Sequence, residues 1–149
     1  MLKITIDDHQ VRKALQRVQR HLDDLTPVMR AVAMELEARV SQRFETERDP
    51  TGRPWRALSP RTVARKKGRG RILYDSGDLL GSLTSRAGRD FAEVGFGQPY
   101  AAYHEYGTRK MPRRGLLMAD PAAQTLSDAD RDAVLETISE ALARALAKP

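Results

Sequence analysis

A stretch of twelve residues that is dense in proline and glycine, 49–60, constrains the fold more than any other feature. Its helix-breaking residues are Pro50, Gly52, Pro54 and Pro60. Because they follow one another so closely, no helix can pass through this stretch. The stretch nevertheless carries Trp55, the single tryptophan of the chain, and Leu58. A large indole favours burial, so we expect Trp55 to pack against its own fold, with a neighbouring subunit as the alternative.

A short strand and a helix are predicted at the amino-terminal end. Residues 2–6 alternate with period two, which predicts a strand whose inner face carries Leu2, Ile4 and Ile6. Apolar residues then recur at steps of three and four, which predicts an amphipathic helix with Asp7 or Asp8 as its N-cap. The members of this apolar stripe are Val11, Leu15, Val18, Leu22 and Leu25.

A second helix is predicted from Thr26, as its cap, to about Glu47. Pro27 falls in its first turn, where the missing N–H group costs nothing. The residues expected to face the core are Val28, Met29, Val32, Ala33, Leu36, Val40 and Phe44.

The middle of the chain changes to shorter elements. A short helix at 60–67 precedes a basic run without apolar residues, which predicts a flexible loop at about 64–71. One or two helical turns are expected at 78–82. Residues 82–87 and 91–97 predict a β-hairpin.

Three further elements complete the chain. A short helix at 99–106 is expected to end at Gly107, and residues 110–118 are expected to be extended at their end. Ser127 and Asp130 resemble a capping box that opens a helix to about Ala147. The apolar stripe of this last helix consists of Val134, Leu135, Ile138, Leu142 and Leu146.

Locally paired strands with helices segregated toward the ends predict an α+β fold. The expected order is an N-terminal strand and two long helices, a central antiparallel sheet with a short helix, and a long C-terminal helix. A length of 149 residues fits a single domain spanning 1–149. The amino-terminal sequence predicts no signal peptide, and no apolar run approaches the roughly 20 residues that span a bilayer.

The net charge of +6 is concentrated in one segment. Residues 48–71 contain nine basic residues and one acidic residue, so this segment carries +8 and the rest of the chain −2. Such a segment indicates a local anionic partner, either phosphate or an acidic protein surface; the alternative is a solvated loop that favours solubility. The basic side chains of the predicted loop are Arg65, Lys66, Lys67, Arg69 and Arg71.

Catalytic patterns are not evident. The chain has no cysteine, which excludes disulfides and thiolate chemistry. His104 and Glu105 are adjacent in a predicted helix, so they point about 100° apart, and the H-E-x-x-H spacing fails because position 108 is Thr. Asp75 and Asp78 fit turn and cap roles better than a magnesium site. We therefore predict no enzyme activity and no catalytic, metal or cofactor site.

Non-specific DNA binding is the main alternative that the charge pattern leaves open. The basic 48–71 segment could neutralise several phosphates together with Arg109, Lys110, Arg113 and Arg114. No helix-turn-helix pattern, zinc module or row of aromatic residues that could stack bases accompanies them. Recognition of a specific base sequence is therefore not expected.

Three motifs, taken in order, resemble the phage virion morphogenesis family, the tail-completion proteins of long-tailed phages and Mu-like prophages. The first is G-x-x-W-x-x-L, with Gly52, Trp55 and Leu58. The second is I-L-x-x-S-G-x-L-x-x-S-L, from Ile72 to Leu83, and the third is Y-A-x-x-H-E-Y-G-T, from Tyr100 to Thr108. Each motif is weak alone, but their order and spacing are fairly specific.

Two shorter elements extend the resemblance over most of residues 30–120. They are Val94-Gly95 and the Pro112-Arg113 pair. The chain departs from the family pattern after the second pair, because it carries Leu116 and Leu117 where an aromatic residue is expected.

The resemblance implies a structural protein of the phage neck or tail end, assembled in the host cytoplasm. It would complete or cap the tail and join it to the head connector as a ring of six copies. Its partners would be further copies of itself, the tail tube or tail terminator, and the connector proteins. Since aromatic and arginine side chains dominate interface energetics, the expected interface residues are Trp55, Leu58, Tyr100, Tyr103, Tyr106, Arg113 and Arg114. The basic loop would face DNA in the lumen or an acidic partner.

Overall fold

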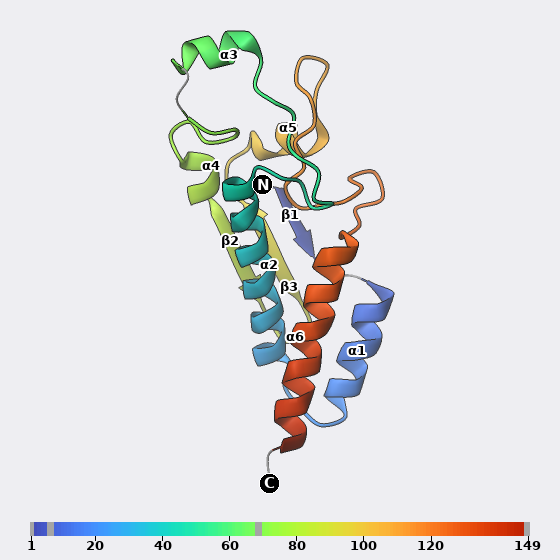
Figure 1. Ribbon diagram of the computed structural model, residues 1–149. Coiled ribbons are helices and arrows are strands. Elements are labelled where there is room, and N and C mark those ends of the chain that lie inside the picture. The colour runs from blue at the N-terminus through green and yellow to red at the C-terminus, as the bar shows by residue number, and fades with distance from the viewer. Residues whose placement is uncertain (1, 6–7, 68–69, 148–149) are drawn as a thin grey trace.

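The computed structural model describes residues 2–5, 8–67 and 70–147, and it has the predicted α+β class. Helices α1, α2 and α6 lie together at one end of an elongated molecule, whereas α3 and α5 lie with long loops at the other end (Figure 1). The elements are β1 (Leu2–Thr5), α1 (His9–Gln19), α2 (Thr26–Thr46), α3 (Pro60–Arg65), α4 (Asp78–Gly81), β2 (Leu83–Ala87), β3 (Ala92–Phe96), α5 (Ala101–Tyr106) and α6 (Asp128–Ala147).

The sheet is antiparallel with the order β1-β3-β2, so the predicted hairpin of β2 and β3 is confirmed. The amino-terminal strand β1 pairs with β3, and Leu2 lies opposite Phe96. Gly95 faces Lys3 across this pairing, and a Cβ at position 95 would lie 2.5 Å from the carbonyl oxygen of Leu2. The close approach of β1 therefore requires glycine at this position of the Val94-Gly95 pair.

The core lies between this sheet and α2. All seven residues of α2 that were predicted to face the core are buried. Phe44 near the end of α2 packs against Phe96 of β3, with ring centroids 5.9 Å apart. On its other side α2 packs against α6, which also packs against α1. Burial of this helical stripe is the main hydrophobic contribution to the fold.

Two predictions at the first helices need correction. Thr26 is not the cap of α2, because the side chain of Asp24 accepts hydrogen bonds from the Thr26 N–H group at 2.9 Å and the Thr26 hydroxyl at 2.7 Å. Helix α1 ends at Gln19, so Leu22 and Leu25 lie beyond it. Asp8 caps α1 as predicted, while positions 6 and 7 lie outside the described residues.

The final helix also differs in part from its prediction. Ser127 accepts a hydrogen bond from the Asp130 N–H group at 3.1 Å, but the Asp130 carboxylate pairs with arginines of α2, so only half of a capping box forms. Leu146 was expected to face the core, yet it is 60% exposed, and Ala141 is buried instead. Among the described residues, no helix combines the length and the apolar character that crossing a membrane requires.

The basic loop is partly anchored. The ammonium group of Lys66 donates hydrogen bonds to the carbonyl oxygens of Arg71 at 3.0 Å and Tyr74 at 3.3 Å. Position 69, the central arginine of the predicted loop, lies outside the described residues. The helix before the loop, α3, has no buried residue and projects as an arm (Figure 1).

Residues 110–118 do not end as an extended segment. Leu116, Leu117 and Met118 are buried, and their N–H groups turn toward the carboxylate of Glu105. A strand would have pointed successive N–H groups in opposite directions, so the segment bends to bring them together.

Candidate functional site

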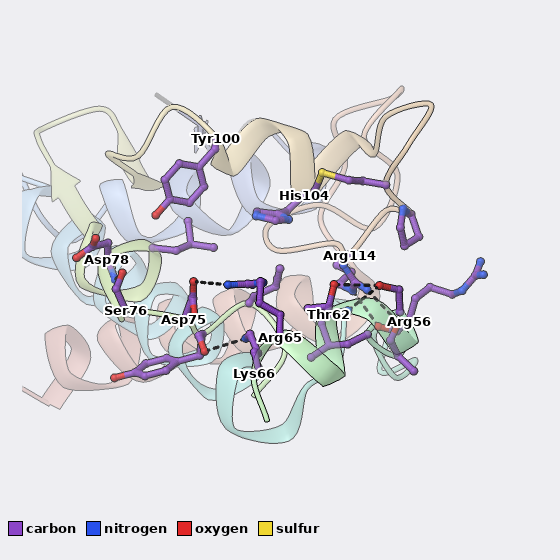
Figure 2. A pocket seen from close by; sticks show the side chains of 18 of the residues that line it. Arg56, Thr62, Arg65, Lys66, Asp75, Ser76, Asp78, Tyr100, His104 and Arg114 are labelled. Atoms are coloured by element: carbon purple, nitrogen blue, oxygen red, sulfur yellow. Dashed lines mark hydrogen bonds and ion pairs between the residues drawn. The ribbon is translucent and has the colours of Figure 1, made fainter. Parts of the chain in front are cut away.

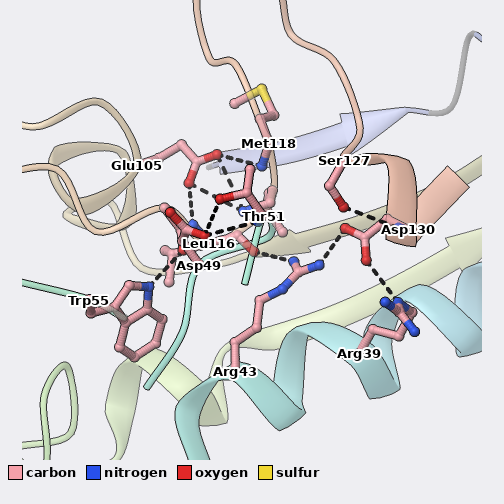
Figure 3. Close-up of polar contacts among 12 residues, drawn as sticks. Arg39, Arg43, Asp49, Thr51, Trp55, Glu105, Leu116, Met118, Ser127 and Asp130 are labelled. Carbon is pink, nitrogen blue, oxygen red and sulfur yellow. Dashed lines mark hydrogen bonds and ion pairs between the residues drawn. The ribbon is translucent and has the colours of Figure 1, made fainter. Parts of the chain in front are cut away.

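A buried carboxylate in the third motif organises the loop at residues 116–118. Glu105 lies on α5 and is fully buried. Its carboxylate accepts hydrogen bonds from the N–H groups of Leu116, of Leu117 at 3.2 Å and of Met118 at 2.7 Å (Figure 3). Successive N–H groups that converge in this way form an anion-binding concavity, so the chain supplies the anion to its own loop.

Side chains from α2 and from the proline-rich stretch fix the same loop from other directions. Arg43 donates hydrogen bonds to the carbonyl oxygen of Leu116 and to Asp130 (Figure 3). Trp55 donates its indole N–H to the carbonyl oxygen of Gly115 at 2.9 Å, and its ring packs edge-on against Phe44. The prediction that Trp55 packs against its own fold is therefore confirmed.

The adjacent arginines Arg113 and Arg114 also bind their own chain. Arg113 donates to the carbonyl oxygens of Glu105 at 2.7 Å and Met118 at 2.6 Å. Arg114 is buried and donates to the carbonyl oxygens of Arg56 at 2.8 Å and Ala57 at 3.1 Å. Together they attach the proline-rich stretch to α5, and this attachment makes the loop end of the molecule a defined surface.

A cleft of about 550 Å³ opens between α5 and the α3–α4 segment. In Figure 2, Tyr100 and His104 point from α5 toward it, while Arg65, Lys66 and Asp75 line the opposite wall. Arg65 pairs with Asp75 at 3.6 Å. Arg56, Lys110 and Arg114 add positive charge to the lining.

The electrostatics of this cleft are those of a basic site. Burial, reinforced by the charge of Arg114, lowers the pKa of His104 below its ordinary value. Burial and then the charge of Arg56 lower the pKa of Arg114. The Nδ1 atom of His104 is buried and has no hydrogen-bond partner among the described residues. Burial is the larger cause of both pKa shifts, and the neighbouring arginine charges add to it.

The predicted interface residues separate into two groups. Tyr100, Tyr103 and Tyr106 are 38%, 58% and 48% exposed and follow at steps of three on and just before α5; these three exposed tyrosines are called the aromatic surface. Trp55 and Arg114 are buried in their own chain, so they could affect an interface only through the loops that they hold. Leu58 and Arg113 are half-buried.

Sequence reasoning missed the structural role of Glu105. The pair His104-Glu105 was tested only as a metal or catalytic motif. A signal was present, because Ala101 precedes Glu105 by four positions and both lie on the buried face of α5. An acid on a buried face requires hydrogen-bond donors from elsewhere in the chain.

Recognition is the chemistry that this arrangement supports best. Within the described ranges, no three His, Asp or Glu side chains lie close enough together to hold a metal ion. The buried Arg43, Glu105, Arg114 and Asp130 side chains are bound to backbone groups or to each other, whereas the tyrosines and several basic residues are exposed. Exposed aromatic and basic groups on a fixed scaffold are typical of the class of proteins that bind other macromolecules.

The chain belongs to the phage virion morphogenesis family, whose family model matches residues 6–143. It is 33% identical over 144 residues to the Mu-like prophage FluMu G protein 2 of Haemophilus influenzae, covering 94% of this chain and 95% of that protein. It is 35% identical over 111 residues to the "Putative capsid assembly protein G" of Escherichia phage Mu, covering 67% and 71%. No solved structure is significantly similar.

A second Haemophilus influenzae protein, Mu-like prophage FluMu G protein 1, is 26% identical over 121 residues, covering 78% of this chain and 82% of that protein. These matches confirm the family that the three motifs indicated. The chain is therefore a bacteriophage structural protein of virion morphogenesis.

Proposed function

We propose that the chain completes the phage tail and joins it to the head connector, as a ring of copies in the neck of the virion. The observation that carries this proposal is the aromatic surface of Tyr100, Tyr103 and Tyr106. It lies on a helix that Glu105 fixes from its inner side, beside the projecting arm α3 (Figure 1). Rigid aromatic groups on a fixed helix suit a protein interface, because little conformational entropy is lost on binding.

The partners in this proposal are further copies of the chain, the tail tube or tail terminator, and the connector. Copies in a ring meet head-to-tail through two different surfaces. A ring of six matches the symmetry that the family implies for the tail. The aromatic surface would then contact either the next copy or the tail.

Electron microscopy of the purified protein, alone and mixed with tail tubes, tests this proposal. We expect rings, at least on the tube ends, and we expect them to be lost when all three tyrosines are replaced by serine. Met34→Ser is the matched control, because Met34 is 59% exposed on α2, outside the aromatic surface. Normal rings from the triple serine variant, or no binding of the unchanged protein to tubes, would contradict the proposal.

Non-specific DNA contact is a second candidate function, which the exposed basic residues at the arm favour. Arg56, Arg61, Arg65 and Lys67 are all exposed there. They could face DNA that passes through the ring. A DNA affinity that falls steeply between 50 and 200 mM salt, as about 10³-fold for six phosphate contacts, would support it, whereas the same affinity after replacing these four residues by serine would exclude it.

A further inference from the structure

The positive charge of the cleft between α3 and α5 has no acidic partner at one end. Arg56, Lys110 and Arg114 form no ion pair with any described residue, and Arg114 uses its donors on carbonyl oxygens. The acids of the cleft lie toward its other end, where Asp75 pairs with Arg65 (Figure 2). The basic end therefore has the charge to receive carboxylates from outside.

Two uncharged groups of α5 accompany these cations. The buried Nδ1 atom of His104 lacks a hydrogen-bond partner among the described residues. The Tyr100 ring lies edge-on to the His104 ring, with centroids 6.1 Å apart, and is partly exposed. Because that Nδ1 atom is buried, a carboxylate from outside can meet only the exposed part of the imidazole and the Tyr100 side chain. Both groups can donate hydrogen bonds to carboxylates, so they complement the cations of the cleft.

A matching row of acids runs along α6. Asp128, Asp132, Glu136 and Glu140 recur every four residues and are all exposed. Asp128 pairs with Arg131 at 2.9 Å, whereas the other three form no ion pair with a described residue. The row lies opposite the buried face of α6, and positions 132 to 140 span about 12 Å along the helix axis.

The cleft and this acidic row lie on different parts of the molecule. The cleft is at the end formed by α3 and α5, while the row follows α6 toward the opposite end (Figure 1). They can therefore pair only between two copies. A contact between two different surfaces of identical copies is head-to-tail, and it produces a closed ring or a filament.

We propose that the basic end of the α3–α5 cleft receives the acidic row of α6, residues 132, 136 and 140, from a second copy of this chain. The inference rests on the proposed ring and names the two surfaces that form it. Tyr100 and His104 then contact the carboxylates of the neighbouring helix. The arm α3 lies over the same helix from the other wall of the cleft.

Charge reversal tests the pairing. The cleft variant carries Arg56→Glu and Lys110→Glu, and the row variant carries Asp132→Lys, Glu136→Lys and Glu140→Lys; all five side chains are exposed, so both variants should fold. Each alone should lower the association constant at least tenfold and shift the mass toward the monomer. Circular dichroism checks that each variant is folded. Light scattering measures its association, with tail tubes added where the unchanged protein requires them.

A mixture of the two variants provides the decisive measurement. The reversed cleft of one variant then complements the reversed row of the other, and at the next contact the unchanged cleft meets the unchanged row. Alternating rings should therefore form from the mixture, although neither variant associates alone. A variant that carries all five changes should likewise recover rings by itself.

Matched controls separate this pairing from net charge. Asp23→Lys, Glu45→Lys and Asp90→Lys change the charge by as much as the row variant, at exposed positions outside α6, and should leave the rings intact. Rings from either reversed variant alone, or none from the mixture and the fivefold variant, would overturn the inference and leave the proposed ring standing. An unchanged protein that stays monomeric with and without tubes would overturn both proposals.

Discussion

The carboxylate of Glu105 and the N–H group of Met118 are joined by a 2.7 Å hydrogen bond, which connects α5 to a buried loop thirteen residues later. Leu116 and Leu117 donate to the same carboxylate. The conspicuous His-Glu pair of the third motif therefore contains a structural acid. Its effect on assembly is indirect, because it fixes the helix that displays the exposed tyrosines.

Glu105→Ala should lower the free energy of unfolding by about 3–5 kcal/mol. The substitution leaves three buried N–H groups without an acceptor, and each costs about 1–3 kcal/mol, less than additively. Urea unfolding of the purified chain measures the loss. Glu105→Gln, which keeps one acceptor oxygen, should lose less. Glu45→Ala, at an exposed position of α2, is the control and should change stability by under about 0.5 kcal/mol. A loss below about 1 kcal/mol for Glu105→Ala would contradict the role assigned to this carboxylate.

The buried pair of Arg43 and Asp130 should behave as a coupled unit. Asp130 is fully buried and also accepts a hydrogen bond from Arg39 at 2.8 Å. Asp130→Leu should cost about 3–5 kcal/mol, because it leaves the Arg43 guanidinium buried without its acid. The double variant Arg43→Met, Asp130→Leu should cost less than the sum of its single variants. Denaturant unfolding of all four proteins measures the coupling, and strict additivity would show that the two side chains act independently.

The long helices could be predicted from the sequence because their stability depends on a local period. The apolar stripe of α2, from Val28 to Phe44, repeats at steps that only a helix places on one face, and all of it is buried. The hairpin of β2 and β3 could be predicted for the same reason, because the alternating residues of its strands and the turn between them are close together in the sequence. Trp55 could be assigned to the core from its size alone.

The rest depends on partners that are distant in the sequence. Glu105 binds backbone N–H groups, which every residue except proline possesses, so no side-chain pattern marks the loop that it will bind. Asp130 was predicted to cap its own helix, but two arginines on α2 compete for its carboxylate. Asp24 displaced Thr26 as the acceptor before α2 in the same way. In each case a polar group found its partner outside the local pattern from which its role was predicted.

Trp55 and Tyr103 should separate stability from association. Trp55→Phe loses the hydrogen bond to Gly115, which should cost about 1–2 kcal/mol, and Trp55→Ala should cost about 3–5 kcal/mol. Trp55→Phe should still form rings, because the indole is buried in its own chain. Tyr103→Ser should leave the unfolding free energy within about 0.5 kcal/mol of that of the unchanged protein and weaken association. Unfolding curves and particle mass are measured on the same samples. The division would be contradicted if Trp55→Phe weakened association and Tyr103→Ser lowered stability.

The cleft should make the stability of the isolated chain sensitive to pH through His104. Burial, and secondarily the charge of Arg114, lower the pKa of this imidazole in the folded state. The unfolded chain therefore binds the proton more readily, and folding loses stability as the pH falls below about 6.5, the ordinary histidine value, toward the lowered folded pKa.

His104→Gln removes this titration. Between pH 7.5 and pH 5.5 the unchanged protein should therefore lose more unfolding free energy than the variant. Measuring the difference cancels the contribution of every other titrating group. Carboxylates placed in the cleft by a neighbouring copy would raise the pKa of His104 again, because they stabilise the imidazolium form. A nuclear magnetic resonance titration of His104, in the monomeric row variant and in the assembled protein, should therefore give a higher pKa after assembly. Identical pH dependence of the unchanged protein and His104→Gln would show that the imidazole is not held in a desolvated, positively charged site.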